Sequence, residues 1–132
     1  MRAEQPLLKV RDLRVVFQGE GGPVEILRGV DFDLRAGETL GLVGASGSGK
    51  SVTAQSILGL IKHPPLVEMT GRVVFDGEDL VGQPPARLRR VRGRRIAYIF
   101  QEPMSALNPV FTVGDQIAEM AALHLGLGRK AA

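Results

Sequence analysis

The chain has 132 residues, of which 44% are hydrophobic, and a formal net charge of +3. This length and composition suit one small folded domain rather than a disordered chain. The chain has no cysteine, which excludes disulfide bonds and thiolate metal sites, and no stretch approaches the length of a membrane span. Its N-terminal residues lack the apolar core of a signal peptide, so we expect a cytoplasmic protein.

Residues 1–36 predict an antiparallel β part. Leu7 to Phe17 alternates loosely between apolar and polar side chains and runs into a glycine-rich loop, which is typical of a strand and a turn. Val24 to Leu27 and Val30 to Leu34 predict two further short strands, the second with aspartates on one face. Because that face is polar, we expect the sheet to be antiparallel.

Residues 44–51 match the pattern G-x-x-x-x-G-K-[ST], in which a glycine-rich loop cradles the phosphates of a nucleotide. The glycines let successive backbone N–H groups face one concavity without a Cβ in the way of the anion. Lys50 would place its ammonium against the β- and γ-phosphates, and the hydroxyl of Ser51 would be one ligand of a Mg²⁺. The predicted nucleotide-binding residues of the loop and the turn after it are Gly44, Ala45, Ser46, Gly47, Ser48, Gly49, Lys50, Ser51 and Val52.

This pattern is informative when a strand precedes the loop and a helix follows it. Thr39 to Val43 is a short apolar run that predicts a strand buried on both faces, as in a parallel sheet. Ser51 to Ile61 has apolar residues at helical spacing, and we expect the helix to stop at His63-Pro64-Pro65. Residues 37–62 therefore predict the strand, loop and helix of an α/β nucleotide-binding fold. The alternative, a glycine-rich turn with an incidental lysine, is disfavoured by this context.

Residues 70–100 predict further strands. Gly71 to Phe75 predicts a strand, and Asp76-Gly77-Glu78-Asp79 predicts a turn. We therefore interpret Asp76 as a turn residue rather than as the magnesium-binding aspartate of a nucleotidase motif. Arg95 to Phe100 is nearly all apolar and predicts another strand buried on both faces.

Six arginines crowd into nine residues before that last strand: Arg87, Arg89, Arg90, Arg92, Arg94 and Arg95. One interpretation is a patch that binds nucleic acid or acidic lipid. The other is the solvated face of a short helix that enters through Pro84-Pro85, turns Leu88 and Val91 inward and closes at Gly93. Because no aromatic residues interleave with the arginines to stack on bases, we favour the second interpretation and expect no nucleic-acid partner.

Residues 101–132 predict a loop followed by a helix. Gln101-Glu102-Pro103 ends the preceding strand, and Asn108-Pro109 interrupts any regular structure in the loop. Thr112 to Asp115 fits a helix N-cap, and apolar residues at helical spacing continue to Leu125. We expect a loose tail from Gly126 to Ala132.

Residues 37–53, residues 71–80 and Ile99 to Pro109 resemble the N-terminal part of an ATP-binding-cassette (ABC) transporter ATPase. The resemblance is strongest to the group that powers oligopeptide and dipeptide importers. The most specific part of the resemblance is Ile99 to Pro109, where Gln101 is followed by Glu-Pro-Met, two small residues and Leu-Asn-Pro. It implies a P-loop NTPase of the ABC type, an α/β fold whose mixed sheet has an N-terminal antiparallel part, truncated within its helical subdomain.

The resemblance implies roles for two further residues. Gln101 would be the glutamine of the family's Q-loop, which reaches the Mg²⁺ and the attacking water. The implied catalytic residues are then Lys50 and Gln101, and the implied metal-binding residues are Ser51 and Gln101. Phe17 would be the aromatic residue that stacks on adenine, although it could instead be a core residue beside Val15. The implied cofactors are ATP and Mg²⁺.

The resemblance also implies partners and a location. We expect membrane-spanning permease subunits to contact the Q-loop region, and a second ATPase subunit to complete a homo- or heterodimer. We expect the protein to lie peripherally on the cytoplasmic face of the inner membrane. There it would couple ATP hydrolysis to the transport of peptides or related solutes.

The family completes its catalytic site with an LSGGQ-type signature, a Walker B strand ending in Asp-Glu and a later histidine (the H-loop), and this sequence contains none of them. His63 and His124 both precede the position expected for that histidine. We therefore expect the chain to be part of a peptide-importer ATPase, to bind nucleotide weakly at best and to be catalytically incomplete alone. The alternative is a non-catalytic nucleotide-binding or interaction module that is complete at residue 132.

Overall fold

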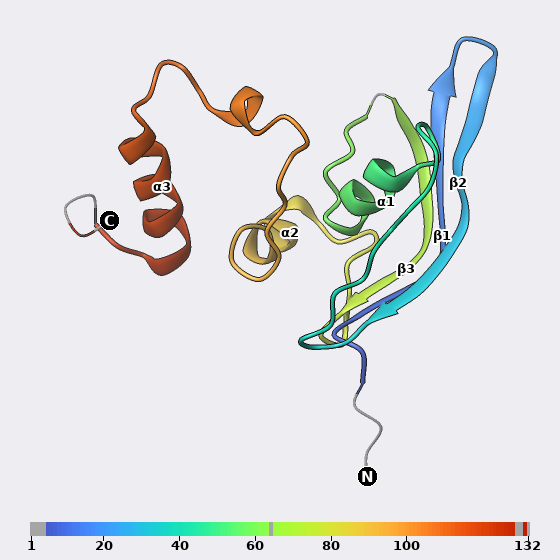
Figure 1. Cartoon of the computed structure of the whole chain (residues 1–132), viewed down its shortest axis with the longest axis horizontal. Helices are drawn as coiled ribbons and strands as arrows, with labels where there is room; N and C mark the ends of the chain where they lie inside the picture. The colour runs from blue at the N-terminus through green and yellow to red at the C-terminus, as the bar shows by residue number, and fades with distance from the viewer. Residues whose placement is uncertain (1–4, 64, 129–130, 132) are drawn as a thin grey trace. The chain divides into compact units, whose positions relative to one another are not determined.

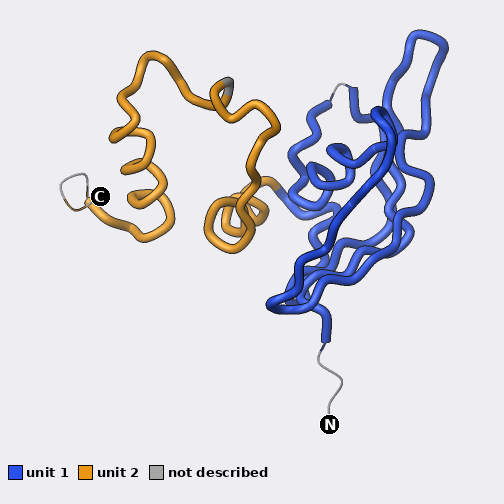
Figure 2. Tube along the Cα trace, viewed as in Figure 1, with its two compact units in different colours: residues 1–84 blue, residues 85–132 orange. Residues whose placement is uncertain are grey.

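The computed structural model describes residues 5–63, 65–128 and 131, and the chain forms two compact units, residues 1–84 and 85–132 (Figures 1 and 2). The first unit contains β1 (Leu8–Gly19), β2 (Gly22–Leu34), α1 (Lys50–Ile57), β3 (Leu66–Phe75) and β4 (Glu78–Asp79). The second unit contains α2 (Pro85–Val91), the 3-10 helix η1 (Pro103–Ala106) and α3 (Val113–Leu125). Pro64 and most of the expected tail beyond residue 128 lie outside the described residues.

Four strands form one antiparallel sheet in the order β2-β1-β3-β4. β1 lies in the middle and pairs along most of its length with both β2 and β3. The antiparallel β part predicted from the N-terminal sequence is therefore confirmed. The two short strands expected at residues 24–27 and 30–34 are one continuous strand, because Gly29 between them takes a φ of 94° and lets the pairing resume.

β1 contains a bulge at Arg11 and Asp12, where it has one residue more than either neighbouring strand. Asp12 takes a φ of 44°, and β3 passes this point at Gly71, where a Cβ would lie 2.7 Å from the carbonyl oxygen of Arg11. Only a residue without a side chain fits there. The extra residue keeps four unevenly spaced apolar side chains of β1 in the core: Leu8, Val10, Leu13 and Val15.

α1 packs on this sheet with two buried hydroxyl residues, Thr53 and Ser56. Their Oγ atoms donate hydrogen bonds to the helix's own carbonyls, Thr53 to Gly49 at 2.9 Å and Ser56 to Val52 at 2.6 Å. Because each hydroxyl is satisfied within the helix, burying it against apolar strands costs little.

α1 ends earlier than the sequence suggested. The backbone N–H of Gly59 donates to the carbonyl of Ser56, and that of Leu60 donates to the carbonyl of Gln55, both at 2.9 Å. With Gly59 at a φ of 58°, these bonds form a Schellman motif, which closes the helix. The predicted stop at the prolines after His63 is therefore wrong, because a glycine ends the helix first.

The turn between β3 and β4 is formed by Asp76 and Gly77, which have φ angles of 48° and 82°. Positive φ at both central residues is typical of the two-residue turn that joins antiparallel strands. The predicted turn at Asp76 and Gly77 is therefore confirmed.

Neither of the two strands predicted to be buried on both faces is formed. Residues 39–43 and 97–100 have no strand assignment, and Val43 and Ile99 are 91% and 87% exposed. A parallel strand requires a hydrogen-bonding neighbour, and no strand in the described part of the chain pairs with either segment. The two predictions are wrong here because apolar composition alone does not supply a pairing partner.

The helices predicted in the second unit are confirmed. α2 buries Leu88 and Val91 and is followed by Gly93, whose φ of 78° ends it as expected. α3 starts after Thr112, whose hydroxyl oxygen accepts a hydrogen bond from the N–H of Asp115 at 3.1 Å. This bond is the N-cap predicted from the sequence.

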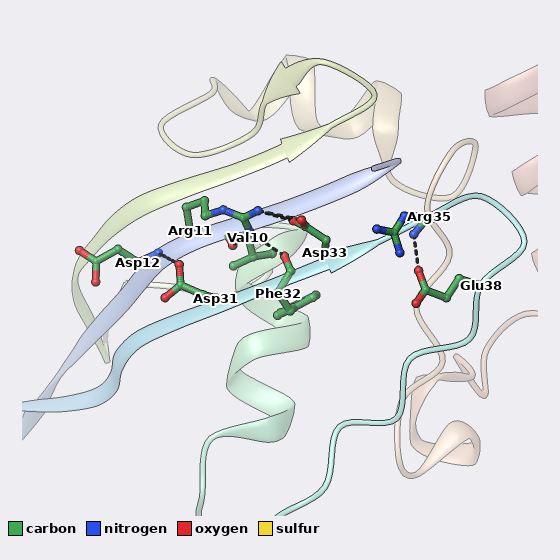
Figure 3. A network of polar contacts seen from close by, with 8 residues as sticks. All are labelled: Val10, Arg11, Asp12, Asp31, Phe32, Asp33, Arg35 and Glu38. Atoms are coloured by element: carbon green, nitrogen blue, oxygen red, sulfur yellow. Dashed lines mark hydrogen bonds and ion pairs between the residues drawn. The ribbon is translucent and has the colours of Figure 1, made fainter. Parts of the chain in front are cut away.

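An ion-pair network joins β1 to β2 at the bulge (Figure 3). Nη2 of Arg11 lies 2.8 and 2.7 Å from the two carboxylate oxygens of Asp33, while Nη1 donates to the carbonyl oxygen of Phe32 at 3.2 Å. The N–H of Asp12 donates to the carboxylate of Asp31 at 3.1 Å. The hydrogen bond from Arg11 holds the pKa of Asp33 below its ordinary value and raises the pKa of Arg11.

We expect Asp33→Asn to destabilise the protein near neutral pH and to have little effect in acid. Because the pKa of Asp33 is lower in the folded than in the unfolded chain, the contribution is fully present above the unfolded value of about 3.9 and is lost as the pH falls through the folded value. The measurement is the free energy of urea unfolding near neutral pH and below about pH 4. Glu20→Gln, in the exposed hairpin loop, is the control and should change little. A pH-independent effect of Asp33→Asn would contradict the ion pair.

Candidate nucleotide-binding site

The glycine-rich loop enters α1 through Gly49, which is buried and takes the left-handed conformation with φ 91° and ψ 6°. A Cβ at this position would lie 2.6 Å from Cδ2 of Leu27 in β2. Only glycine satisfies both the positive φ and the close approach to the sheet. This contact fixes where the N-terminus of α1 begins relative to β2.

No side chain caps the N-terminus of α1, whereas that of α3 has a threonine cap. The first hydrogen bond of α1 runs from the N–H of Thr53 to the carbonyl of Gly49 at 2.8 Å. The N–H groups of Lys50, Ser51 and Val52 come before it and have no acceptor within the helix. A helix end with unpaired N–H groups and a positive dipole is suited to hold phosphate oxygens.

Lys50 folds back across the loop. Its Nζ lies 2.8 Å from the carbonyl oxygen of Gly44, 2.7 Å from that of Ala45 and 3.3 Å from Oγ of Ser48. An ammonium group has three donors and no acceptor, so these three contacts match its full donor capacity. The lysine's charge is thereby held directly over the loop.

The remaining loop residues are accessible to a ligand. Residues 44–48 and Ser51 are exposed, while Val52 is half-buried behind them. The hydroxyl of Ser51 is a hard oxygen ligand, which suits a Mg²⁺ that takes its other ligands from phosphate and water. The described residues contain no cluster of three or more histidine, cysteine, aspartate or glutamate side chains that could hold a metal ion by themselves.

An open cavity of about 410 Å³ lies beside the loop. β2 lines one side with residues 25–28 and Val30, and the loop lines the other with Gly47 and Ser48. Its volume falls within the roughly 300–1,000 Å³ typical of small-molecule sites. The cavity beside the loop is therefore large enough for a small molecule.

The two remaining predicted site residues, Phe17 and Gln101, are distant from this loop in the sequence, and their roles stay predictions. Phe17 is half-buried in β1, paired with Val24 and Leu66, and does not line the cavity. Gln101 lies in an exposed bend of the second unit.

Sequence reasoning missed Gln116, which fastens the loop that follows Gln101. Its side chain accepts a hydrogen bond from the N–H of Asn108 at 3.0 Å and donates to the carbonyls of Asn108 and Phe111, each at 3.1 Å. A single glutamine on a helix surface forms no recognisable pattern. From the sequence, Asn108-Pro109 predicted only that this region is a loop.

Comparison with known proteins decides the family. Residues 27–131, which include the glycine-rich loop and α1, match the family model described as ABC transporter. This chain belongs to the ABC transporter family. The family assigned from the resemblance in the sequence is confirmed.

Among proteins of this family, the chain is 48% identical over 126 residues to the oligopeptide transport ATP-binding protein OppD of Bacillus subtilis. It is 46% identical over 128 residues to the dipeptide transport ATP-binding protein DppD of the same species, and 51% identical over 120 residues to the peptidoglycan transport ATP-binding protein YejF of Agrobacterium fabrum. These alignments cover 96%, 97% and 91% of this chain but only 35%, 38% and 22% of the relatives.

The fold also matches a solved ABC cassette. The dimeric structure of MJ0796, a bacterial ABC transporter cassette, superposes with a TM-score of 0.72 at 24% identity, covering 86% of this chain and 46% of that one. The predicted fold class, an ABC-type α/β fold with an antiparallel β part, is therefore confirmed. In the described part of the chain, no helix has the length and apolar character needed to cross a membrane.

We expect Gly49→Ala to destabilise the protein far more than Gly47→Ala. Both glycines have positive φ, but a Cβ at Gly47 meets no atom within 4 Å, whereas one at Gly49 meets Leu27. Backbone strain alone costs about 1 kcal/mol or more, so Gly47→Ala measures that part, and Gly49→Ala should exceed it by roughly 1–3 kcal/mol because of overpacking. Urea unfolding of both variants checks this, and equal losses would contradict the contact with Leu27.

Proposed function

We propose that the protein is the ATP-binding subunit of an ABC importer and that this chain contains the part that holds the phosphates of ATP. One observation carries the proposal: the uncapped N-terminus of α1 follows a glycine-rich loop over which Lys50 is folded. A phosphate chain would accept hydrogen bonds both from the loop and first-turn N–H groups and from Lys50. The relatives support ATP as the nucleotide, since each is named an ATP-binding protein.

The other site residues take the roles implied by the family resemblance. Ser51 and Gln101 would ligate Mg²⁺, and Phe17 would stack on adenine. When bound, Mg²⁺ would neutralise charge on the phosphates. Lys50 and Gln101 would be the catalytic residues of this chain. Phosphoryl transfer depends mainly on positioning and electrostatic stabilisation, so these residues are part of the machinery and not all of it.

We further propose that the whole protein couples ATP hydrolysis to uptake of peptides or related solutes. The names of the relatives, which transport oligopeptides, dipeptides or peptidoglycan, support this substrate class. Permease subunits would contact the region around Gln101, and a second ATPase subunit would complete the assembly, in line with the dimeric structure of MJ0796. The protein would lie on the cytoplasmic face of the inner membrane. We also propose that the chain is organised in four parts, residues 1–36, 37–62, 70–100 and 101–132.

We expect Lys50→Ala to weaken binding of ATP, measured by titration calorimetry on the full chain in the presence of Mg²⁺. Charge-assisted hydrogen bonds contribute about 1.5–3 kcal/mol, so the dissociation constant should rise roughly 10- to 100-fold. Lys62→Ala, which removes an exposed lysine from the same unit, should leave it unchanged. An equal effect of both variants would mean that only net charge matters and would contradict the phosphate contact.

We expect Ser51→Ala to remove most of the Mg²⁺ dependence of ATP binding while affecting binding without the metal much less. The hydroxyl is the ligand that this loop offers to Mg²⁺, whereas the N–H groups and Lys50 act on phosphate directly. The check is calorimetric titration with ATP in Mg²⁺ and in chelator, comparing Ser51→Ala with Ser46→Ala, a matched serine in the loop. If the two variants showed the same response to the metal, Ser51 would not be a ligand.

A further inference from the structure

The nucleotide site does not use the arginine cluster, which we define as Arg87, Arg89, Arg90, Arg92, Arg94 and Arg95. The cluster occupies α2 and the turn that follows it, entirely within the second unit.

The cluster is carried by an ordered piece of backbone. Leu88 and Val91 anchor α2, with 9% and 3% of their surface exposed. After Gly93 the chain doubles back, since the N–H groups of Arg95 and Ile96 both donate to the carbonyl of Val91, at 2.9 and 3.1 Å. The arginines after the helix are thereby held close to those on it rather than spread along a flexible tail.

The sequence around the cluster is poor in acidic residues. The sequence has no aspartate or glutamate between Asp79 and Glu102. Within the described residues, Arg89, Arg90 and Arg94 are exposed and make no ion pair. Partial burial, together with the neighbouring charge of Arg89, lowers the pKa of Arg92. Arg89, Arg90 and Arg94 are therefore a concentrated positive surface, to which an external anion would be attracted.

The sequence alone favoured a solvated helix face for these arginines, but with the exposed cluster held together by the backbone we propose that it binds anionic phospholipid headgroups at a membrane surface. Guanidinium groups form paired hydrogen bonds with phosphate oxygens, and several arginines side by side match a surface that carries many phosphates.

A nucleic acid offers the same phosphate chemistry but fits this surface less well. No aromatic residue lies among the arginines, so stacking on bases is not available inside the cluster. The nearest rings, Tyr98 and Phe100, pack against each other edge to face with centroids 4.7 Å apart. Membership of a transporter family also favours a lipid over a nucleic acid as the source of these phosphates. The proposed lipid binding does not depend on nucleotide binding.

The test is sedimentation of the full chain with vesicles of phosphatidylcholine alone or mixed in equal parts with phosphatidylglycerol. The chain should bind the mixed vesicles and not the neutral ones, and high salt should release it. Arg89→Gln/Arg90→Gln should weaken binding about 25-fold, at about fivefold for each arginine. Arg89→Lys/Arg90→Lys keeps the charge but loses the paired hydrogen bonds, so its binding should fall between that of the wild type and that of the glutamine variant.

The matched control is Arg35→Gln/Lys62→Gln, which removes the same charge from exposed positions of the first unit and should weaken binding little. Equal losses in the two glutamine variants would overturn the inference, as would failure of the wild type to bind the mixed vesicles. The same titration with a single-stranded oligonucleotide provides the competing outcome. Tighter binding to the oligonucleotide than to the vesicles, with loss in Arg89→Gln/Arg90→Gln, would replace lipid by nucleic acid.

Discussion

The contact between the backbone of Gly49 and the side chain of Leu27 is the constraint on which the candidate site depends. Because no Cβ intervenes, α1 starts directly against the edge strand β2, and its first N–H groups open onto the loop. The same closeness places Gly47 and Ser48 opposite β2, across the cavity. The site is therefore built by joining a helix end to a strand edge, and the antiparallel sheet serves to hold that edge in position.

Local signals made part of the fold predictable. The N-cap at Thr112, the end of α2 at Gly93 and the turn at Asp76 each depend on the conformation of a few consecutive residues, and the sequence contains those residues. The bulge in β1 was not predicted, because it is defined by the pairing of β1 with its two neighbouring strands. Gly59, which ends α1, is a local signal too, but the sequence offers a second stop signal in the prolines after His63 and does not show which of the two ends the helix.

The two strand predictions that depended on partners distant in the sequence are wrong. Residues 39–43 and Arg95 to Phe100 have the composition of buried parallel strands, yet a strand exists only through its neighbours, and composition does not provide them. The candidate site also combines a local motif with residues whose roles depend on distant elements. The phosphate loop is one continuous motif and could be predicted as a whole, whereas the roles of Phe17 and Gln101 depend on where separate elements lie. Gln116 was missed because its partners are backbone groups, which have no sequence signature.

The hydrogen bonds from Lys50 to the carbonyls of Gly44 and Ala45 compete with any bond between Lys50 and a ligand. A ligand atom replaces these carbonyls only if it is a stronger acceptor, and an anionic oxygen is stronger than a carbonyl oxygen. A neutral ligand of similar shape, such as a nucleoside, offers only neutral acceptors, which are not stronger than those carbonyls. With Lys50 in this position, an anionic ligand would be favoured over a neutral ligand of the same shape.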